Sequence, residues 1–576
     1  MKSLKEFKPL LKLVKEDKKR IIIASTIIFL SGLCEIFTGY LNGAAVEAIT
    51  KLNIRDSIMY LLMYFILEIT MDGYILFIAN SMFLKAESAL TRKLGFLTYK
   101  KVLNLPAVAF EEKTSGEFIN RIINDADSLS FAFRRLLNMI ASLVASIIII
   151  IYIFIKSYII GIEILILVTI ILLILKKYSP QLKEKHIERK KGQDEFASLT
   201  TETIRGIREV KTLGIKKNLV GDMEKTVKSI FSKSSEEIEV QRKFDTYTSL
   251  VKTVLEVGVL LTCVVLLYYK QITLTFFVAM TYYIYRYTWL INNINDLTQT
   301  YQRVNVSISR VNELLENKLY NDVEFGNIDI KNISGVIEFK NVTFSYPNED
   351  KILDNFSLTV VPNQKIAIVG ASGQGKSTLF NLITRIFDVQ NGQILIDNVD
   401  VRDLTEESLR KNVSVIRQEP FIFNRTVKEN FKLVDKNIKL NDIRKYAKMA
   451  YIDDYIMSLP EKYDTKLGES GINLSGGQKQ RLSIARALCK KSKIILFDEA
   501  TSALDNKSQE YIKSSIDSLV KDHTVMIVAH RLSTIIDADI IYVVDNGRVV
   551  ASGTHKELLS KNKIYKSLYK TETLNS

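Results

Sequence analysis

The sequence predicts a multidomain chain in which an all-α membrane domain with six helices precedes an α/β domain. Two observations carry this prediction. Six apolar stretches, each about as long as the twenty residues that span a bilayer, lie in residues 21–300. From Val336 onwards the pattern changes to short apolar strands that alternate with helices.

Composition fits a chain with one membrane half and one soluble half. Hydrophobic residues make up 47% of the 576 residues, and charged residues still make up 25%. The formal net charge of +15 would suit a nucleic-acid partner. However, the excess of Lys and Arg lies in Met1–Arg20, Lys85–Lys113 and Lys176–Lys252, beside the apolar stretches. This is the positive-inside bias of a membrane protein, so we expect membrane lipid and no nucleic acid as a partner. The three cysteines have no spacing typical of a disulfide framework or a zinc site.

Residues 21–300 are predicted to form the transmembrane domain, and residues 1–20 a short amphipathic helix at the cytoplasmic interface. The connections that would face outward are short, whereas the inward ones are long, basic and rich in helix formers. We therefore expect both termini in the cytoplasm and long helical extensions below the membrane. The expected spans are Ile21–Ala48, Ile58–Leu84, Leu136–Ile155, Tyr158–Leu175, Tyr247–Tyr269 and Leu274–Leu297.

Several charged residues interrupt these spans, and the last span is rich in tyrosine. Intramembrane charges are costly and usually face a water-filled cavity or a partner. One interpretation is an acidic, aromatic translocation cavity; the other is pairing within the bundle or a place near the interface. The candidate cavity residues are Glu35, Glu68, Asp72, Glu256, Tyr283 and Arg286.

The second half begins after a polar stretch, residues 301–335, that we interpret as a linker. Residues 336–576 form the predicted α/β domain. Its most informative feature is the phosphate loop, Gly370–Thr378, between the apolar strand Lys365–Val369 and a predicted helix. Glycines there let successive backbone N–H groups surround a phosphate at a helix N-terminus, while Lys376 reaches the β- and γ-phosphates. The loop residues expected to bind nucleotide are Gly370, Ser372, Gly373, Gly375, Lys376, Ser377 and Thr378.

Two further stretches carry chemistry. The apolar strand Lys493–Phe497 ends in Asp498 and Glu499. Asp498 and Ser377 can hold Mg²⁺, and Glu499 is placed to polarise an attacking water. The second stretch, Leu474–Gln478, contributes Ser475, Gly476, Gly477 and Gln478 at the start of a helix, a second anion-binding N-terminus. One nucleotide rarely needs two such sites from one chain, which indicates a second subunit.

These motifs resemble those of the ATP-binding cassette (ABC) transporters, specifically exporter-type half-transporters with a membrane domain before the ATPase domain. The resemblance covers nearly the whole chain. Leu474–Gln478 matches the signature motif of the family, and Tyr346 the aromatic residue that stacks on adenine. Gln418 matches the glutamine that senses Mg²⁺ and the membrane domain, Asp505 belongs to the loop that crosses the dimer, and His530 matches the histidine at the γ-phosphate.

The resemblance implies a mechanism. Two ATPase domains close head to tail around two ATP molecules, with Mg²⁺ held by Ser377, Gln418 and Asp498. Catalysis in one subunit is expected from Lys376, Gln418, Glu499 and His530, while the signature acts on the partner's nucleotide. Because Glu499, His530 and the signature are all intact, we expect a homodimer in a bacterial plasma membrane. Coupling helices in the two long inward loops would rest on the ATPase domains; Ser470 departs from the family where a basic residue is common.

The cargo is less determined. An acidic, tyrosine-rich cavity favours an amphipathic substrate, either a peptide or a drug-like cation, moved outward from the cytoplasm or inner leaflet by alternating access. A lipid flippase of the same fold is the alternative. An importer and a regulatory protein that carries no cargo also stay open.

Overall fold

A computed structural model describes residues 15–112, 115–284, 307–316, 320, 323–347, 349–371, 373–468, 471, 473–498, 506–529 and 535–575. The chain divides into two compact units. The helical unit comprises Met1–Leu103 and Thr114–Leu319, and the α/β unit comprises Asn104–Lys113 and Tyr320–Ser576. The short segment Asn104–Lys113, from the first predicted inward loop, therefore belongs to the same compact unit as the second half of the chain.

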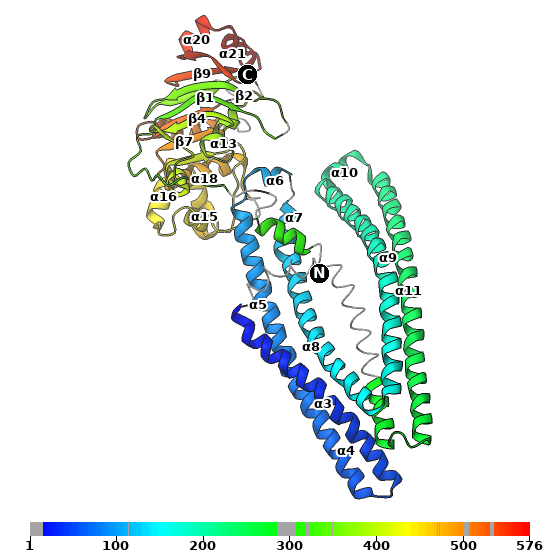
Figure 1. The fold of residues 1–576 in the computed structure, drawn as a ribbon. Coiled ribbons are helices and arrows are strands. Elements are labelled where there is room, and N and C mark those ends of the chain that lie inside the picture. The colour runs from blue at the N-terminus through cyan, green and yellow to red at the C-terminus, as the bar shows by residue number, and fades with distance from the viewer. Residues whose placement is uncertain are drawn as a thin grey trace. The chain divides into compact units, whose positions relative to one another are not determined.

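The helical unit consists of long helices and their short connections (Figure 1). Its elements are η1 (Lys15–Asp17), α3 (Lys18–Thr50), α4 (Ile54–Glu68), η2 (Ile69–Ile75), α5 (Leu76–Leu103), α7 (Ser115–Asn120), η3 (Arg121–Asp125), α8 (Ala126–Lys156), α9 (Tyr158–Arg205), α10 (Ile207–Leu213) and α11 (Lys216–Tyr268). The segments η2 and η3 are π-helical turns that leave their helices continuous. An apolar helix, Leu274–Ile284, follows α11.

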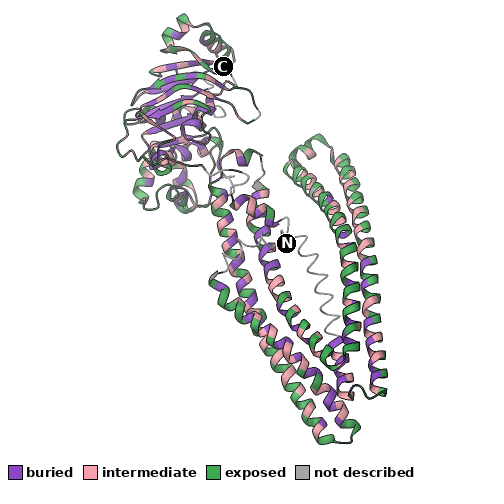
Figure 2. Cartoon of the chain, viewed as in Figure 1, coloured by how far each residue is buried: buried purple, intermediate pink, exposed green. Residues whose placement is uncertain are grey.

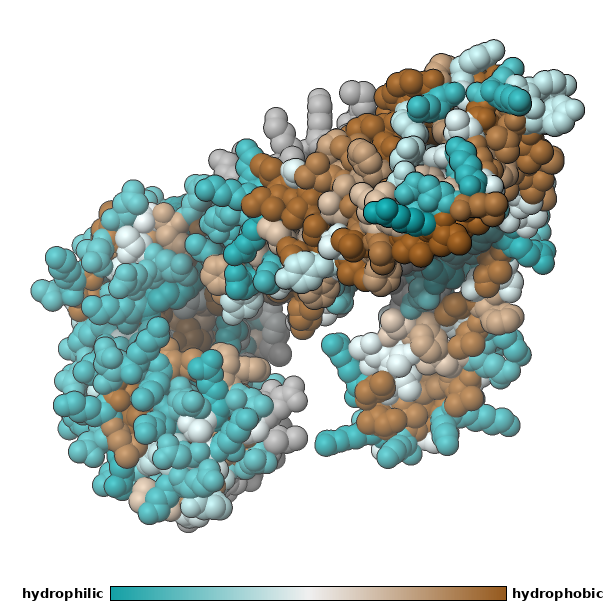
Figure 3. Space-filling view, turned by 90° about the horizontal axis from the view of Figure 1, so that it is seen from below, coloured by the Kyte–Doolittle hydropathy of each residue, from teal (hydrophilic) through white to brown (hydrophobic). Residues whose placement is uncertain are grey.

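Among the described residues, five helices are long and apolar enough to cross a membrane, and they contain five of the six expected spans. The sixth expected span begins as the helix Leu274–Ile284, and its remainder lies outside the described residues. These helices expose large apolar side chains, such as Phe65 and Phe77. Figure 2 shows exposed positions along much of their length. Apolar residues accordingly cover much of the surface of the helical unit in Figure 3. A helix that is apolar on its outer face fits a lipid environment.

The long inward connections prove to be continuous extensions of the spans. Helix α9 runs 48 residues and α11 runs 53, and the two lie side by side along their length. Ion pairs link their polar parts: Lys185 binds Glu236 at 2.7 Å, and Arg189 binds Glu237. The expectation of long helical extensions is therefore met.

The interpretation of residues 301–335 as a linker needs correction at its start. Residues 307–315 are helical, and Ile308 and Val311 are buried against Leu90 and Leu129 of the helical unit. The stretch reads as polar because only one side of this helix is apolar, so its average hydropathy hides the buried side. The boundary between the units follows at Leu319.

The α/β unit contains two sheets. A four-stranded antiparallel sheet has the order β2 (Leu353–Val360), β1 (Ile337–Phe344), β4 (Asn391–Ile396) and β5 (Val399–Asp400). A six-stranded sheet has the order β10 (Arg548–Gly553), β9 (Ile540–Asp545), β3 (Lys365–Val369), β8 (Thr524–Val528), β7 (Ile494–Asp498) and β6 (Val413–Ile416). Strands β9, β3, β8, β7 and β6 are parallel, and only β10 pairs antiparallel.

Helices accompany these sheets. They are α6 (Val108–Glu112), α13 (Lys376–Ile383), α14 (Glu406–Asn412), α15 (Val427–Lys432), α16 (Leu440–Met449), α17 (Asp453–Ser458), η4 (Lys462–Asp464), α18 (Gly476–Cys489), α19 (Asn506–Leu519), α20 (His555–Lys561) and α21 (Lys563–Asn575).

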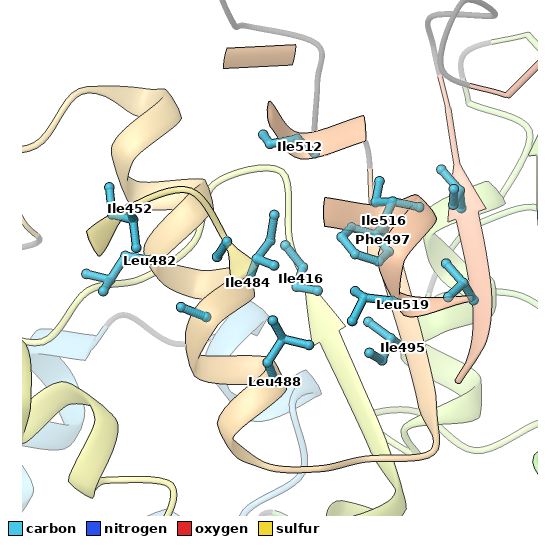
Figure 4. Close-up of a cluster of buried hydrophobic side chains, with 14 of the residues drawn as sticks. Ile416, Ile452, Leu482, Ile484, Leu488, Ile495, Phe497, Ile512, Ile516 and Leu519 are labelled. Carbon is cyan, nitrogen blue, oxygen red and sulfur yellow. The ribbon is translucent and has the colours of Figure 1, made fainter. Parts of the chain in front are cut away.

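Two apolar cores stabilise the α/β unit. One lies between the two sheets and includes Phe339, Phe356 and Phe380; Ala107 and Val108 of the Asn104–Lys113 segment pack against it. The other lies between the parallel sheet and the helices α16, α18 and α19. Figure 4 shows this second core, in which Ile484 and Leu488 of α18 lie on the side of Ile416, Ile495 and Phe497 of the sheet, while Leu482 lies on the other side of the helix, near Ile452. The carboxyl ends of β3 and β7 lie at the same edge of this sheet, where α/β proteins bind ligands.

Candidate nucleotide site

The phosphate loop joins the end of β3 to the start of α13, as the sequence predicts. Gly375, just before the helix, has a φ of +76°, and a Cβ there would stand 2.4 Å from Ile352 Cγ2. Gly370 lies so close to the neighbouring backbone that a Cβ would meet the carbonyl oxygen of Val544 at 2.3 Å. Only glycine fits either place without strain. The loop can therefore present its backbone N–H groups at the N-terminus of α13.

Lys376 is held inside this loop. Its Nζ donates hydrogen bonds to the carbonyl oxygens of Gly370, at 3.0 Å, and Ala371, at 2.7 Å. The residue is only 5% exposed, so the ammonium group is fixed at the loop and not free in solvent. A positive charge at this place can bind the phosphate groups of a nucleotide.

Ser377 and Asp498 meet across the site. The hydroxyl Oγ of Ser377, at the start of α13, donates a hydrogen bond of 2.7 Å to Oδ1 of Asp498, at the end of β7. A hydroxyl and a carboxylate are both oxygen ligands, the kind that Mg²⁺ prefers. The residues present thus fit a magnesium ion, which would neutralise charge on the phosphates of a nucleotide.

Tyr346 stands at the rim of the same site. Its Oη lies 3.3 Å from Oγ1 of Thr378 and accepts a hydrogen bond of 3.3 Å from Nδ2 of Asn381. Its ring makes edge contacts with Phe344 and Phe387, each at a centroid distance of 5.0 Å. These contacts fix an aromatic ring, partly exposed, beside the phosphate loop. Sequence reasoning did not identify Asn381, which connects Tyr346 to the helix.

The signature residues form the N-terminus of α18. The backbone N–H of Ser475 donates to Oε1 of Gln478 at 2.8 Å, and the N–H of Gln478 donates to Oγ of Ser475 at 3.3 Å. This reciprocal arrangement, a capping box, shapes the helix start and leaves Gly476 exposed. Within the described residues, no hydrogen bond joins Ser475, Gly476, Gly477 or Gln478 to the phosphate loop.

Gln418 follows β6, and its side chain is exposed. Its carbonyl oxygen accepts a hydrogen bond of 3.0 Å from Nε2 of Gln480, a residue that the sequence analysis did not single out. The described structure thus brings the phosphate loop, Asp498 and Tyr346 together. Ser372, Glu499, Asp505 and His530 lie outside the described residues. Glu499 directly follows the end of β7, and His530 comes two residues after β8, a neighbouring parallel strand.

The candidate cavity residues have different environments. Glu35 is buried within α3, and Glu68, at the end of α4, and Glu256, on α11, are partly buried. Tyr283 is fully buried: its Oη donates to the carbonyl oxygen of Ile36 at 2.7 Å, and its ring packs against Tyr152. Tyr283 is therefore in contact with other helices of the bundle in this structure. Arg286 and the side chain of Asp72 lie outside the described part of the chain.

Sequence reasoning also missed Glu163 on α9. A Cβ at Gly258 of α11 would stand 2.8 Å from its Oε1, which places the carboxylate between these helices. The signal was available, because Glu163 is the single charged residue within the expected span Tyr158–Leu175.

Comparisons with known proteins agree with this geometry. The family model described as ABC transporter transmembrane region matches residues 21–290, and the model described as ABC transporter matches residues 353–502. A Bacillus subtilis protein provisionally named a multidrug export ATP-binding/permease protein is 33% identical over 80% of each chain. An ATP-dependent lipid A-core flippase of Pseudomonas syringae is 30% identical over 95% of this chain and 92% of its own.

The fold has a counterpart among solved structures. A bacterial Atm1-family ABC exporter with ATP bound aligns with a TM-score of 0.82 over 96% of this chain and 98% of the other. The identity is 24%, so this likeness bears on the fold alone.

Proposed function

The chain belongs to the ABC transporters, and on this premise we propose that two copies form an ATP-driven exporter of an amphipathic peptide or drug-like cation. It is a multi-pass membrane protein of a bacterial exporter family, and its ATPase domain binds ATP. One observation carries the proposal: within the described residues, a phosphate loop with Lys376 held in it and Ser377 bonded to Asp498 occurs in the same chain as five membrane-length helices. Both termini would lie in the cytoplasm, where ATP is available.

Each ATP site would combine residues of the phosphate loop with residues at or just after the ends of β1, β6, β7 and β8. Lys376, fixed in the phosphate loop, would bind the β- and γ-phosphates, and Tyr346 would stack on the adenine. Ser377 and Asp498 would hold Mg²⁺, together with Gln418, which matches the family's magnesium-sensing glutamine. The ion would neutralise charge on the phosphate that is transferred. Glu499 would position the attacking water, and His530 would contact the γ-phosphate.

The second half of each ATP site would come from the other subunit. The exposed N-terminus of α18 would bind the γ-phosphate of the partner's ATP through Ser475, Gly476, Gly477 and Gln478. A helix N-terminus favours an anion, and the phosphate loop of the same chain lies at a different helix, α13. Asp505 would lie at the same dimer contact. ATP then favours the closed pair, and hydrolysis removes that preference. Since the chain contains every motif, a homodimer would have two competent sites.

Coupling to the membrane helices would begin at the segment Asn104–Lys113. It belongs to the compact α/β unit, and its residues Ala107 and Val108 pack against the core between the two sheets. Residues on either side of it continue into α5 and α7. A change in the ATPase domain would therefore reach these helices directly through the chain.

The acidic residues Glu35 and Glu256, inside apolar helices, support a cationic or amphipathic cargo by Coulomb attraction in a partly desolvated site. Tyr283 is buried in this structure, so this support for a cationic cargo comes from the acidic residues and not from its ring. A lipid is the second candidate cargo, favoured by the flippase of Pseudomonas syringae that aligns over 95% of this chain.

The test is ATPase activity of the purified protein in lipid nanodiscs, titrated with a cationic peptide, a leader-bearing peptide, a lipophilic cation and a lipid. Saturable stimulation by one of the two peptides or by the cation supports the proposed cargo. Stimulation by the lipid alone replaces that cargo with the lipid. Activity that persists in a Lys376→Ala variant would contradict the proposed ATP site, whereas Lys351→Ala, at an exposed lysine, is the matched control.

A further inference from the structure

A series of hydrogen bonds connects the residue after β6 to the phosphate loop, and we call it the hydrogen-bond chain. A terminal nitrogen of Arg417 donates to Oδ1 of Asn381, on α13, at 3.3 Å. Nδ2 of the same amide donates to Oη of Tyr346, which follows β1, at 3.3 Å. That Oη lies 3.3 Å from Oγ1 of Thr378, in the first turn of α13. Side chains from three separate parts of the α/β unit thus meet at the nucleotide site.

Arg417 fixes the direction of the hydrogen-bond chain. A guanidinium group has hydrogen-bond donors and no acceptor, so the atom of Asn381 that faces it must be the amide oxygen. The amide nitrogen then has to face Tyr346, and this nitrogen can only donate. Oη of Tyr346 therefore accepts that bond, and the tyrosine directs its own hydrogen to a different acceptor.

The acceptor is Thr378. In the part of the chain that the structure describes, Oη of Tyr346 has two hydrogen-bond partners, Nδ2 of Asn381 and Oγ1 of Thr378. Because the nitrogen is a donor, the tyrosine hydroxyl donates to Oγ1 of Thr378. A hydroxyl that accepts one hydrogen bond keeps its own hydrogen for another. The hydrogen of Thr378 is therefore left for donation to a phosphate group.

The hydroxyl of Thr378 differs from that of Thr384, the next threonine in the sequence. Threonine in a helix often donates to the backbone carbonyl one turn earlier. Thr384 does so, to the carbonyl oxygen of Phe380 at 2.7 Å, whereas within the described residues no such bond from Thr378 occurs. Thr378 is only 5% exposed, and a buried hydroxyl hydrogen without an acceptor is costly. A nucleotide phosphate would supply that acceptor.

We propose that Asn381 is a positioning residue for ATP binding: held by Arg417, it directs the hydrogen-bond chain so that Thr378 donates to a phosphate of the nucleotide. The inference rests on the proposed function, in which Thr378 and Tyr346 belong to the ATP site. The opposite direction would turn the hydrogen of Thr378 towards Tyr346 and away from the nucleotide. Either direction makes the same number of bonds, so the direction matters for ATP binding and not for the stability of the fold.

Asn381→Asp reverses the direction of the hydrogen-bond chain with almost no change of shape. A carboxylate accepts at both oxygens, so it takes the bond from Arg417 and also the hydrogen of Tyr346. Oη of Tyr346 then accepts the hydrogen of Thr378. Three quantities are measured for the full-length protein in nanodiscs: the equilibrium dissociation constant for ATP in EDTA, where turnover stops, kcat and KM for ATP with Mg²⁺, and the thermal unfolding midpoint.

For Asn381→Asp we expect the dissociation constant and the KM for ATP to rise by about tenfold, which corresponds to the loss of one hydrogen bond to a charged group. The kcat should stay within about twofold of wild type, and the unfolding midpoint should not fall. Asn363→Asp is the matched control. Oδ1 of Asn363 accepts a bond from Nζ of Lys493 at 2.8 Å, at the opposite end of β3 from the phosphate loop. This variant undergoes the same chemical change and should bind ATP as the wild type does.

A double variant separates the direction of the hydrogen-bond chain from the added negative charge. Tyr346→Phe keeps the aromatic ring and removes the hydroxyl that connects Asn381 to Thr378. In this background, Asn381→Asp should raise the dissociation constant by less than about twofold. Repulsion between the new carboxylate and the phosphates does not need the hydroxyl. A tenfold loss that persists in Tyr346→Phe would therefore overturn the proposal, and so would wild-type affinity in Asn381→Asp alone.

Arg417→Met decides the matter if Asn381→Asp does not fold, because the side chain of Arg417 is exposed. The substitution releases the amide of Asn381 and should raise the dissociation constant by about threefold. In Tyr346→Phe it should have no further effect, and an equal loss in both backgrounds would contradict the proposal. Failure of the proposed function looks different. In that case the wild-type protein itself would show no ATPase activity that Lys376→Ala abolishes.

Discussion

The hydroxyl of Ser377 donates a 2.7 Å hydrogen bond to Oδ1 of Asp498, which joins residues 121 positions apart in the sequence. The bond brings the start of α13 and the end of β7 to one point beside the phosphate loop. It therefore assembles, from two separate motifs, the pair of oxygen atoms that the proposed Mg²⁺ site requires.

The first prediction concerns this pair. Asp498→Asn keeps an oxygen that can accept the Ser377 hydrogen bond but removes the negative charge. We expect the Mg²⁺ concentration for half-maximal ATPase activity to rise by about tenfold or more. Chelation of the metal should stop turnover in both proteins. Asp522→Asn, at an exposed carboxylate, is the control. An unchanged Mg²⁺ requirement in Asp498→Asn would show that Asp498 is not part of the metal site.

The second prediction concerns Glu499, which directly follows Asp498 in the sequence. Glu499→Gln retains the shape of the side chain and loses the charge that polarises water. ATP should still bind, while turnover falls by at least about a hundredfold. The variant should accumulate a closed dimer with ATP retained, measured by nucleotide retention after rapid desalting. Wild-type turnover in this variant would rule out Glu499 as the water-positioning group.

Much of this architecture could be predicted from the sequence. Hydropathy identified the spans because a bilayer demands long apolar helices. Short motifs in the sequence were enough to predict the phosphate loop, Asp498 and the start of α18, because glycine loops and helix caps depend on residues that are neighbours in the chain. Gln480 and Glu163 were not singled out, because each makes its contact with a residue far away in the sequence. Gln480 contacts Gln418, and Glu163 lies beside Gly258. The helix at 307–315 was not predicted, because the mean hydropathy of this stretch is polar although one side of the helix is apolar.

The third prediction is a dependence of stability on pH. Asp453 is 3% exposed and accepts hydrogen bonds from Arg444 at 3.1 and 3.2 Å and from Tyr463 at 2.6 Å. Burial alone would raise the pKa of Asp453, but the bonds from Arg444 and Tyr463 outweigh it, and the pKa is lowered. A carboxyl whose pKa is lower in the folded state stabilises the fold above its ordinary pKa, about 3.9. This contribution is lost as the pH falls through the lower, folded value.

The measurement is the thermal unfolding midpoint of wild type and Asp453→Asn from pH 7 down to pH 3. The wild type should unfold at the higher temperature near neutral pH, by an amount equivalent to about 1–3 kcal/mol. The difference should shrink only below about pH 4. Asp454→Asn, at the neighbouring exposed carboxylate, should behave like the wild type throughout. A difference that is constant over the whole range would assign the effect to packing and not to charge.

The last prediction concerns a close contact between two helices of the helical unit. A Cβ at Gly43 of α3 would stand 2.0 Å from the carbonyl oxygen of Thr275, at the start of the helix Leu274–Ile284. Glu47, one turn later on α3, accepts hydrogen bonds from the backbone N–H and the hydroxyl of Thr275. Gly43 thus lets the two backbones come close, as small residues do between membrane helices. The hydrogen bonds to Glu47 then hold the two helices together.

Gly43→Ala must separate the two backbones and weaken both hydrogen bonds, so we expect a loss of about 1–3 kcal/mol. Gly221→Ala provides the contrast, because nothing lies within 4 Å of a Cβ at this position on α11. There the added methyl group should stabilise the helix by about 0.5–1 kcal/mol. Thermal unfolding in detergent measures both variants. If they shift the midpoint in the same direction, the contact between Gly43 and Thr275 does not limit the stability of the membrane helices.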